Sequence, residues 1–362
     1  GYIKSVRYGL LMRKYISRFK LIRVLFKLQS ILLSFLTITP NKLLCIYKNK
    51  PDLIITSTPS LSFNDIEINA ISKILMIKSL CFVYSWDNLV TKGPIVLKPD
   101  FLGVWNKIMY KEAISIFNFK KANLRITGSF VYEKLFFLAK DLKKKINYES
   151  PRTLLIASHL KKYSGSSYYD VIKDIQEMEN IIKYDRILFR AHPFDDLYEK
   201  KENYLLGIPN LEIDKGLTQV DKLEKFISKK SFENNLIKTI LESDWIITGA
   251  TTFALDALFL GKKIGLLNYL PNGKNSAQGL DLKNINESYE FEHFKRIVQD
   301  NNVSMLNSKN DLFKYLNAIK WEKNKNKLFE SKVARQIIPL GIENSTEKSI
   351  KFIKEIINEE AL

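Results

Sequence analysis

The sequence is poor in cysteine and histidine. Its 362 residues include two cysteines, Cys45 and Cys81, and neither has a metal-ligand spacing around it. This argues against a disulfide scaffold and indicates a reducing compartment. The three histidines, His159, His192 and His293, are dispersed along the chain, so a histidine-built metal site is not expected. We predict no metal and no bound cofactor.

Long apolar runs and early acidic residues are also lacking. The stretch from Ile31 to Ile38 is short, and Pro40 follows it, whereas a transmembrane helix needs ~20 apolar residues. No secretory cleavage pattern is present. Residues 1–50 contain eleven Lys or Arg and no Asp or Glu, within a formal net charge of +18. Nucleic acid, anionic lipid and acidic substrates are the partner classes that this charge admits.

Basic and apolar residues alternate at helical spacing across residues 4–36. Two interpretations stay open: a peripheral helix on an anionic membrane surface, or a core-packing helix with a solvated basic face. We expect a cytoplasmic protein, peripheral at the inner face of the cell membrane under the first interpretation. No recognised nucleic-acid module accompanies the charge, so nucleic acid is not an expected partner.

Apolar runs of strand character alternate with helical stretches along the rest of the chain, which predicts parallel sheets with crossover helices. The expected domains are residues 1–149 and 150–342, followed by a helix over 343–362 that packs back across both. The first half is short of strands, so we expect an amino-terminal portion to be missing. The expected strands lie at residues 53–56, 80–84, 101–105, 124–127, 153–157, 186–189, 211–213, 245–248 and 264–268.

The stretch from Trp245 to Tyr269 is the most informative part of the chain. A strand is followed by a small-residue turn at Gly249, and a helix opens at Thr251 or Thr252. We expect the hydroxyl pair to cap this helix, whose exposed N–H groups form a natural phosphate seat. Gly249 keeps the turn open for a ligand to approach the backbone.

A second loop that suits phosphate follows the strand over residues 187–189. Arg190, His192 and Pro193 stand at the end of this strand. In a doubly wound sheet, both loops open onto the crevice at the carboxyl ends of the strands. Imidazole and guanidinium groups both donate to phosphate. The two loops together predict a nucleotide or another diphosphate ligand.

These residues resemble bacterial GT-B glycosyltransferases of capsule, O-antigen and teichoic-acid biosynthesis. Similar families are the CDP-glycerol glycerophosphotransferases, bacterial polysialyltransferases and Kdo transferases. Their donor-binding domain has a His-Pro motif and a later Ser/Thr pair at a helix start, which His192-Pro193 and Thr251-Thr252 match. The resemblance covers most of residues 50–300 and implies an α/β fold of GT-B type, with two Rossmann-like domains facing a cleft. The acidic motif of the polysialyltransferases is absent, which leaves the catalytic base open.

The resemblance implies further donor-side contacts. Asp256 stands where related enzymes place an acidic residue near the ribose hydroxyls, although a solvent-exposed helix position explains it nearly as well. His159 ends the first strand of the second half, and a loop with lysines and serines follows. This loop suits a phosphate, but it matches no phosphate-binding signature and is equally typical of a surface loop.

On the acceptor side, the block from Tyr84 to Gly93 follows a strand directly. Asp87 is our candidate general base for an inverting, metal-independent transfer, and an Asx turn or helix cap is an equal alternative. Trp86 is a candidate for stacking on a sugar, and Asn88 and Lys92 are candidate acceptor contacts.

The predicted function is transfer of a sugar or phosphorylated unit from an activated donor to a glycan or lipid-linked acceptor. Two alternatives stay open. One is a sugar-nucleotide 2-epimerase of the non-hydrolysing type, which keeps the fold and changes the reaction. The other is a non-enzymatic basic protein that binds a membrane or nucleic acid through residues 1–50.

Overall fold

A computed structural model describes residues 28, 32, 35–59, 62–91, 95, 97–145, 151–159, 167–178, 184–192, 198–214, 229–271, 282–318, 328–339 and 341–358. The chain forms two compact units. The first contains residues 1–134 and 336–362, and the second contains residues 135–335. The division falls within helix α7 (Phe130–Lys143). The domain limits expected from the sequence stay a prediction.

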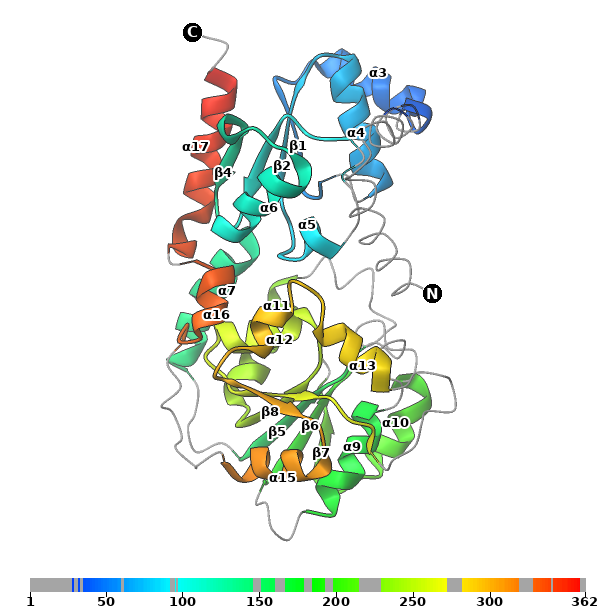
Figure 1. The fold of residues 1–362 in the computed structure, drawn as a ribbon, viewed down its shortest axis with the longest axis vertical. Helices are drawn as coiled ribbons and strands as arrows, with labels where there is room; N and C mark the ends of the chain where they lie inside the picture. The colour runs from blue at the N-terminus through cyan, green and yellow to red at the C-terminus, as the bar shows by residue number, and fades with distance from the viewer. Residues whose placement is uncertain are drawn as a thin grey trace. The chain divides into compact units, whose positions relative to one another are not determined.

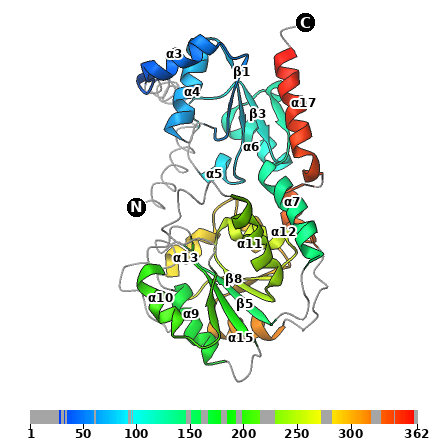
Figure 2. The ribbon, with the colours of Figure 1, turned by 180° about the vertical axis from the view of Figure 1, so that it is seen from behind.

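The first unit is built on a four-stranded parallel sheet in the order β1-β2-β3-β4. The strands are β1 (Leu53–Thr56), β2 (Lys78–Phe82), β3 (Phe101–Val104) and β4 (Leu124–Ile126). The helices are α3 (Pro40–Asn49), α4 (Phe63–Ile74), α5 (Asn88–Thr91), α6 (Lys107–Phe117), the start of α7, the end of α16 (Lys332–Ile337) and α17 (Ser345–Asn358). Figures 1 and 2 show these elements from opposite sides.

The carboxy-terminal helix α17 packs on the sheet of the first unit (Figure 1). Phe352 and Ile356 are buried with Leu80 of β2, and the ring of Phe352 meets that of Phe101 edge-on at 6.1 Å between centroids. Burying a Phe or Ile side chain contributes ~1.5–3 kcal/mol, so α17 is part of the core of this unit. That it also reaches the second unit stays a prediction.

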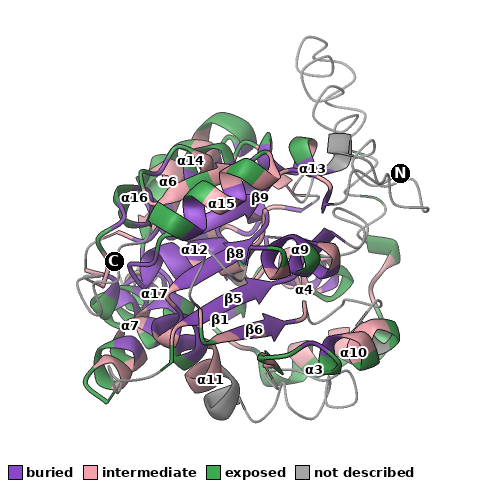
Figure 3. Cartoon of the chain, turned by 90° about the horizontal axis from the view of Figure 1, so that it is seen from below, coloured by how far each residue is buried: buried purple, intermediate pink, exposed green. Residues whose placement is uncertain are grey.

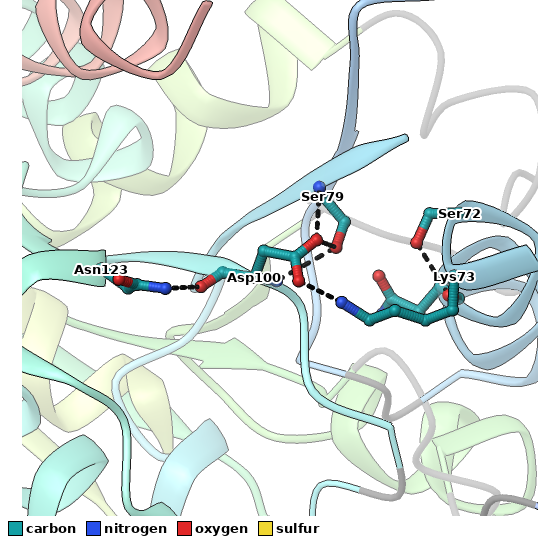
Figure 4. Close-up of polar contacts among 6 residues, drawn as sticks. Ser72, Lys73, Ser79, Asp100 and Asn123 are labelled. Carbon is teal, nitrogen blue, oxygen red and sulfur yellow. Dashed lines mark hydrogen bonds and ion pairs between the residues drawn. The ribbon is translucent and has the colours of Figure 1, made fainter. Parts of the chain in front are cut away.

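A polar cluster joins the amino ends of β2 and β3 (Figure 4). The carboxylate of Asp100 accepts hydrogen bonds from the backbone N–H of Ser79 at 3.0 Å and from its hydroxyl at 2.8 Å, and it pairs with Lys73 of α4. Asn123 donates to the Asp100 carbonyl at 2.8 Å. These bonds fix the strand register at the edge opposite the carboxyl ends, where ligands bind in open α/β sheets.

The second unit is built on a six-stranded parallel sheet in the order β10-β9-β8-β5-β6-β7. Its strands are β5 (Thr153–Ala157), β6 (Arg186–Arg190), β7 (Leu211–Ile213), β8 (Trp245–Thr248), β9 (Ile264–Leu267) and β10 (Val303–Leu306). Its helices are α9 (Ser167–Gln176), α10 (Tyr198–Leu206), α11 (Lys229–Glu242), α12 (Thr252–Phe259), α13 (Leu282–Tyr289), α14 (Lys295–Val298) and α15 (Lys309–Ala318).

Helices cover both faces of this sheet. Helices α9, α10 and α15 pack on one face, and α11 and α12 lie over the other (Figure 1). Strands β5 and β8 are therefore buried along their whole length (Figure 3). Their continuous apolar sequences are what a parallel sheet covered on both faces requires. This is a doubly wound Rossmann-like architecture.

Candidate functional site

The strand order places three predicted loops at one edge of the second sheet. Strand β5 lies between β6 and β8, and all three run parallel. From β5 the chain continues to β6 and β7 on one side, and it then returns to β8 on the other side. Such a reversal is where open α/β sheets bind ligands, outside the carboxyl ends of the strands. The loops after β5, β6 and β8 carry the predicted donor residues.

Ser158 ties the first two of these loops together. Its backbone N–H donates to the Arg190 carbonyl at 2.9 Å, and its hydroxyl accepts from the backbone N–H of His192 at 2.9 Å. His159 follows and is buried, whereas His192 is partly exposed. The position of His192 relative to β5 is therefore fixed by hydrogen bonds. Sequence reasoning missed Ser158, although a serine directly after a buried strand was a usable signal.

The loop after β8 packs against a residue of α9 and a residue that follows β5. A Cβ atom added to Gly249 would lie 2.3 Å from the hydroxyl oxygen of Tyr168 and 3.4 Å from Nδ1 of His159. The structure thus brings His159 and Gly249 together, as a common site requires. The space beside the Gly249 Cα is occupied by Tyr168, however, so this glycine is needed for packing.

Two hydroxyls near the start of α12 have no hydrogen-bond partner among the described residues. They are the buried Oγ1 atoms of Thr248 and Thr251. Thr251 occupies the N-cap position with extended backbone, but its side chain makes no capping bond, so the predicted hydroxyl cap is wrong. Thr252 begins the helix, and Asp256 is partly exposed four residues later. Unpaired buried hydroxyls are rare and point to a missing partner.

Arg190 is engaged within the protein. Its guanidinium forms an ion pair with Asp214, which directly follows β7, and both side chains are at least nine-tenths buried. Asp214 also accepts hydrogen bonds from Asn235 at 3.0 Å and from Thr239 at 3.2 Å, both on α11. The charge of Arg190 is therefore largely balanced, which favours a positioning role over a direct phosphate contact. Sequence reasoning missed Asp214, although an aspartate directly after an expected strand was a signal.

In the first unit, Asp87 lies in the turn between β2 and α5. Its Oδ1 accepts a hydrogen bond from the Ser85 hydroxyl at 2.5 Å, and its Oδ2 accepts one from the Thr91 hydroxyl at 2.8 Å. The backbone N–H groups of Val90 and Thr91 donate to its carbonyl. These contacts are those of a residue that stabilises a helix start.

The neighbours of Asp87 are buried. Trp86 and Asn88 are each 6% exposed, and Asn88 accepts a hydrogen bond from the Ser85 backbone N–H at 2.9 Å. Trp86 therefore packs in the core in this structure and presents little ring surface for stacking. Lys92 and Pro193 lie outside the described residues. The acceptor roles of Trp86, Asn88 and Lys92 stay predictions.

The basic segment over residues 4–36 lies almost entirely outside the described residues. Leu28, Leu32, Phe35 and Leu36 are described, and all four are exposed. Among the described residues, none of the helices combines the length and apolar character needed to cross a membrane. The same residues contain no group of three His, Cys, Asp or Glu side chains arranged to hold a metal ion. Metal independence stays a prediction.

No protein-family model and no curated protein sequence matches the chain. Solved structures do. A putative UDP-N-acetylglucosamine 2-epimerase from Listeria monocytogenes matches with a TM-score of 0.55 at 12% identity, over 92% of this chain and 80% of that chain. The UDP-GlcNAc 2-epimerase from Methanocaldococcus jannaschii matches with a TM-score of 0.53 at 12% identity, over 91% and 82%. The enzyme from Neisseria meningitidis, bound to UDP-GlcNAc, gives 0.52 at 12% identity, over 87% and 79%.

At this identity, the likeness establishes the fold. Together with the two parallel sheets it confirms the predicted class: the chain consists of two Rossmann-like α/β units of the GT-B type.

Proposed function

We propose that the carboxyl edge of the second sheet binds the diphosphate of a nucleotide-activated sugar. The observation that carries this is the pair of buried, unpaired hydroxyls of Thr248 and Thr251 beside the N-terminus of α12. A helix N-terminus has unpaired N–H groups and partial positive charge, and a phosphate oxygen accepts from both N–H and O–H donors. A diphosphate at this turn would supply a partner that the described residues do not give these hydroxyls, once a side-chain rotation exposes them.

The neighbouring loops add to this site. His159 lies beside Gly249, and the His192 backbone is held by Ser158. As imidazolium or neutral donor, either ring stabilises the charge that develops on a leaving phosphate, which needs no metal. Asp256, one turn into α12, is the proposed contact of the ribose hydroxyls. Solved neighbours of the same fold support a nucleotide-sugar ligand, because structures of the Methanocaldococcus and Neisseria epimerases contain UDP-GlcNAc.

We propose that the reaction is an inverting glycosyl transfer. A hydroxyl of the acceptor attacks the anomeric carbon, the bond to the phosphate oxygen breaks, and the nucleotide diphosphate leaves with the electron pair. Asp87 is the proposed base that takes the proton of the attacking hydroxyl. It lies in the turn after β2 and is partly exposed. The proposed acceptor is a surface glycan or its lipid-linked precursor at the cytoplasmic membrane face, with residues 4–36 on the anionic lipid.

A second candidate is 2-epimerisation of a nucleotide sugar. The fold likeness keeps it open, because the three solved structures described above, with TM-scores of 0.52 to 0.55, are named as UDP-GlcNAc 2-epimerases. Epimerisation needs acidic and basic groups around the sugar in addition to phosphate contacts. Asp214 directly follows β7 at the carboxyl ends of the strands, but its carboxylate is already bonded to Arg190, Asn235 and Thr239. Because this acidic group is engaged within the protein, we place glycosyl transfer before epimerisation.

A thermal-shift screen tests the shared donor site. Purified protein is heated with UDP-, GDP-, CMP- and CDP-linked sugars, and a ligand of the folded state raises the melting temperature by mass action. No shift with any of them would contradict the proposed site. Incubation of a hit such as UDP-GlcNAc without acceptor then separates the reactions, since only an epimerase converts the sugar.

His192→Ala tests the role of the β6 loop. We expect turnover of the donor to fall at least tenfold, because a donor to the leaving phosphate is lost. His293→Ala is the matched control, since His293 lies between α13 and α14 and stacks on Phe291. Full activity of His192→Ala would remove this residue from the mechanism.

A further inference from the structure

Tyr168 lies beside the proposed donor site but was not among its predicted residues. It is the second residue of α9 and is 2% exposed. Its hydroxyl oxygen lies against the backbone of Gly249, 2.3 Å from where a Cβ would be, and Nδ1 of His159 is 3.4 Å from the same point. The phenol oxygen and the imidazole therefore flank one spot of the β8–α12 turn.

Tyr168 meets this turn as a neutral phenol. Burial raises the pKa of Tyr168 and of the neighbouring phenol of Tyr289, so both stay neutral hydroxyls. Tyr289 donates its proton to the Leu267 carbonyl at 2.7 Å. The Tyr168 oxygen therefore packs against Gly249 as an uncharged group.

We propose that Tyr168 is a positioning residue of the nucleotide site: its hydroxyl, packed against Gly249 beside His159, sets the conformation of the Gly249–Thr251 turn and the orientation of the His159 ring. This inference rests on the proposed function of the β8–α12 turn. It assigns to Tyr168 no contact with the ligand. It also explains why residue 249 is a glycine, since any Cβ atom there would collide with the phenol oxygen.

The first test removes the hydroxyl alone. In Tyr168→Phe the ring and its packing remain, whereas the hydroxyl and its constraint on the turn are lost. We expect the Kd for UDP, measured by calorimetry, to rise about three- to tenfold. Tyr315→Phe is the matched control, because Tyr315 is equally buried and its hydroxyl donates to the Ile246 carbonyl within β8. It should lower the melting temperature similarly and leave the Kd unchanged.

The second test is a double-mutant cycle. Gly249→Ala places a methyl group against the Tyr168 oxygen, so we expect a melting temperature several degrees lower and a loss of UDP affinity greater than that of Tyr168→Phe. In the double variant the nearest atoms to the new methyl would be the ring carbon Cζ and His159 Nδ1, both 3.4 Å away in the present structure. That is ordinary contact, so the double variant should melt above Gly249→Ala.

The outcomes separate the two proposals. A wild-type protein that binds none of UDP, GDP, CMP and CDP contradicts the proposed function, and the positioning role falls with it. Wild-type binding that Tyr168→Phe leaves unchanged, or that Tyr315→Phe weakens equally, overturns the positioning role alone. If the double variant melts lower than Gly249→Ala, by the sum of the two single losses in melting temperature, the steric relation between Tyr168 and Gly249 is overturned.

Discussion

Replacing Asp214 by asparagine should severely destabilise the second unit. The substitution keeps the size of the side chain and removes its charge. Arg190 then stays almost fully buried beside a neutral amide, since the two side chains are 10% and 5% exposed in the ion pair. Thr239 and Asn235 keep an oxygen to donate to, so the change acts mainly on the charge.

The expected loss follows from the burial of the pair. Removing one partner of a buried ion pair costs about 3–5 kcal/mol, because the remaining charge has lost its compensation. For a unit of this size each 1 kcal/mol shifts the melting temperature by about 2–4 °C. We therefore expect Asp214→Asn to melt roughly 6–20 °C below the wild type.

The same two strands provide a control. Arg186 of β6 pairs with Glu212 of β7 at 3.0 Å, but Glu212 is 58% exposed. Exposed pairs contribute about 0–1 kcal/mol, so Glu212→Gln should leave the melting temperature within a few degrees of the wild type. Thermal and urea unfolding followed by circular dichroism compare the variants. Equal, small effects of Asp214→Asn and Glu212→Gln would refute the reasoning that burial makes the Arg190 pair essential.

Three further predictions concern hydroxyl and charge contacts. Thr251→Val should lower donor affinity about tenfold and leave the free energy of unfolding within ~0.5 kcal/mol of the wild type, because the lost hydroxyl has no partner among the described residues. The control is Ser62→Ala, which removes the helix-cap hydrogen bond that Ser62 accepts from the Asp65 N–H and should lower the free energy of unfolding by about 1 kcal/mol. An equal loss of stability in Thr251→Val would contradict this prediction. Hydrogen bonds from Lys42 and Thr39 lower the pKa of Glu67 from 4.5 to about 2. The wild type should therefore be more stable than Glu67→Gln above pH 4.5, and this advantage should fade as the pH falls toward 2. A difference in the free energy of unfolding that stays constant over this pH range would refute the prediction. Burial lowers the pKa of Lys262 from 10.5 to about 8. Between pH 8 and pH 10.5 the Lys262 amine is therefore protonated more in the unfolded chain than in the folded one. The wild type should gain stability relative to Lys262→Met as the pH rises through this range.

Much of the fold could be predicted because its strands are apolar runs between polar segments. The expected strands at 53–56, 153–157, 211–213 and 245–248 match β1, β5, β7 and β8 to the residue. Strand β10 was missed, because Val303–Leu306 is short, contains Ser304 and is partly exposed except at its end. The helices α10, α13 and α15 were also missed, because each is short and rich in polar residues.

The site residues were harder to predict, because their roles depend on contacts distant in sequence. Sequence alone placed Arg190 at a strand end, but only the structure shows that Asp214 neutralises it. Gly249 was singled out as a donor contact, which stays a prediction, and its packing against Tyr168 could not be inferred from either segment. The prediction that the Thr251 hydroxyl caps α12 was wrong. A threonine at this position can form such a hydrogen bond, but the backbone and side-chain conformation decide whether it does.

The return of helix α17 to the first sheet bears on how the chain folds as it is synthesised. Leu80 is buried with Phe352 and Ile356 of α17, and Leu53 and Phe101 pack against the same cluster. Until the ribosome has added α17, this apolar face is open to water, whereas the second unit is one continuous segment that can close earlier. We therefore expect the order of folding to run against the order of translation, and the nascent first unit to be the stage at which a chaperone is needed.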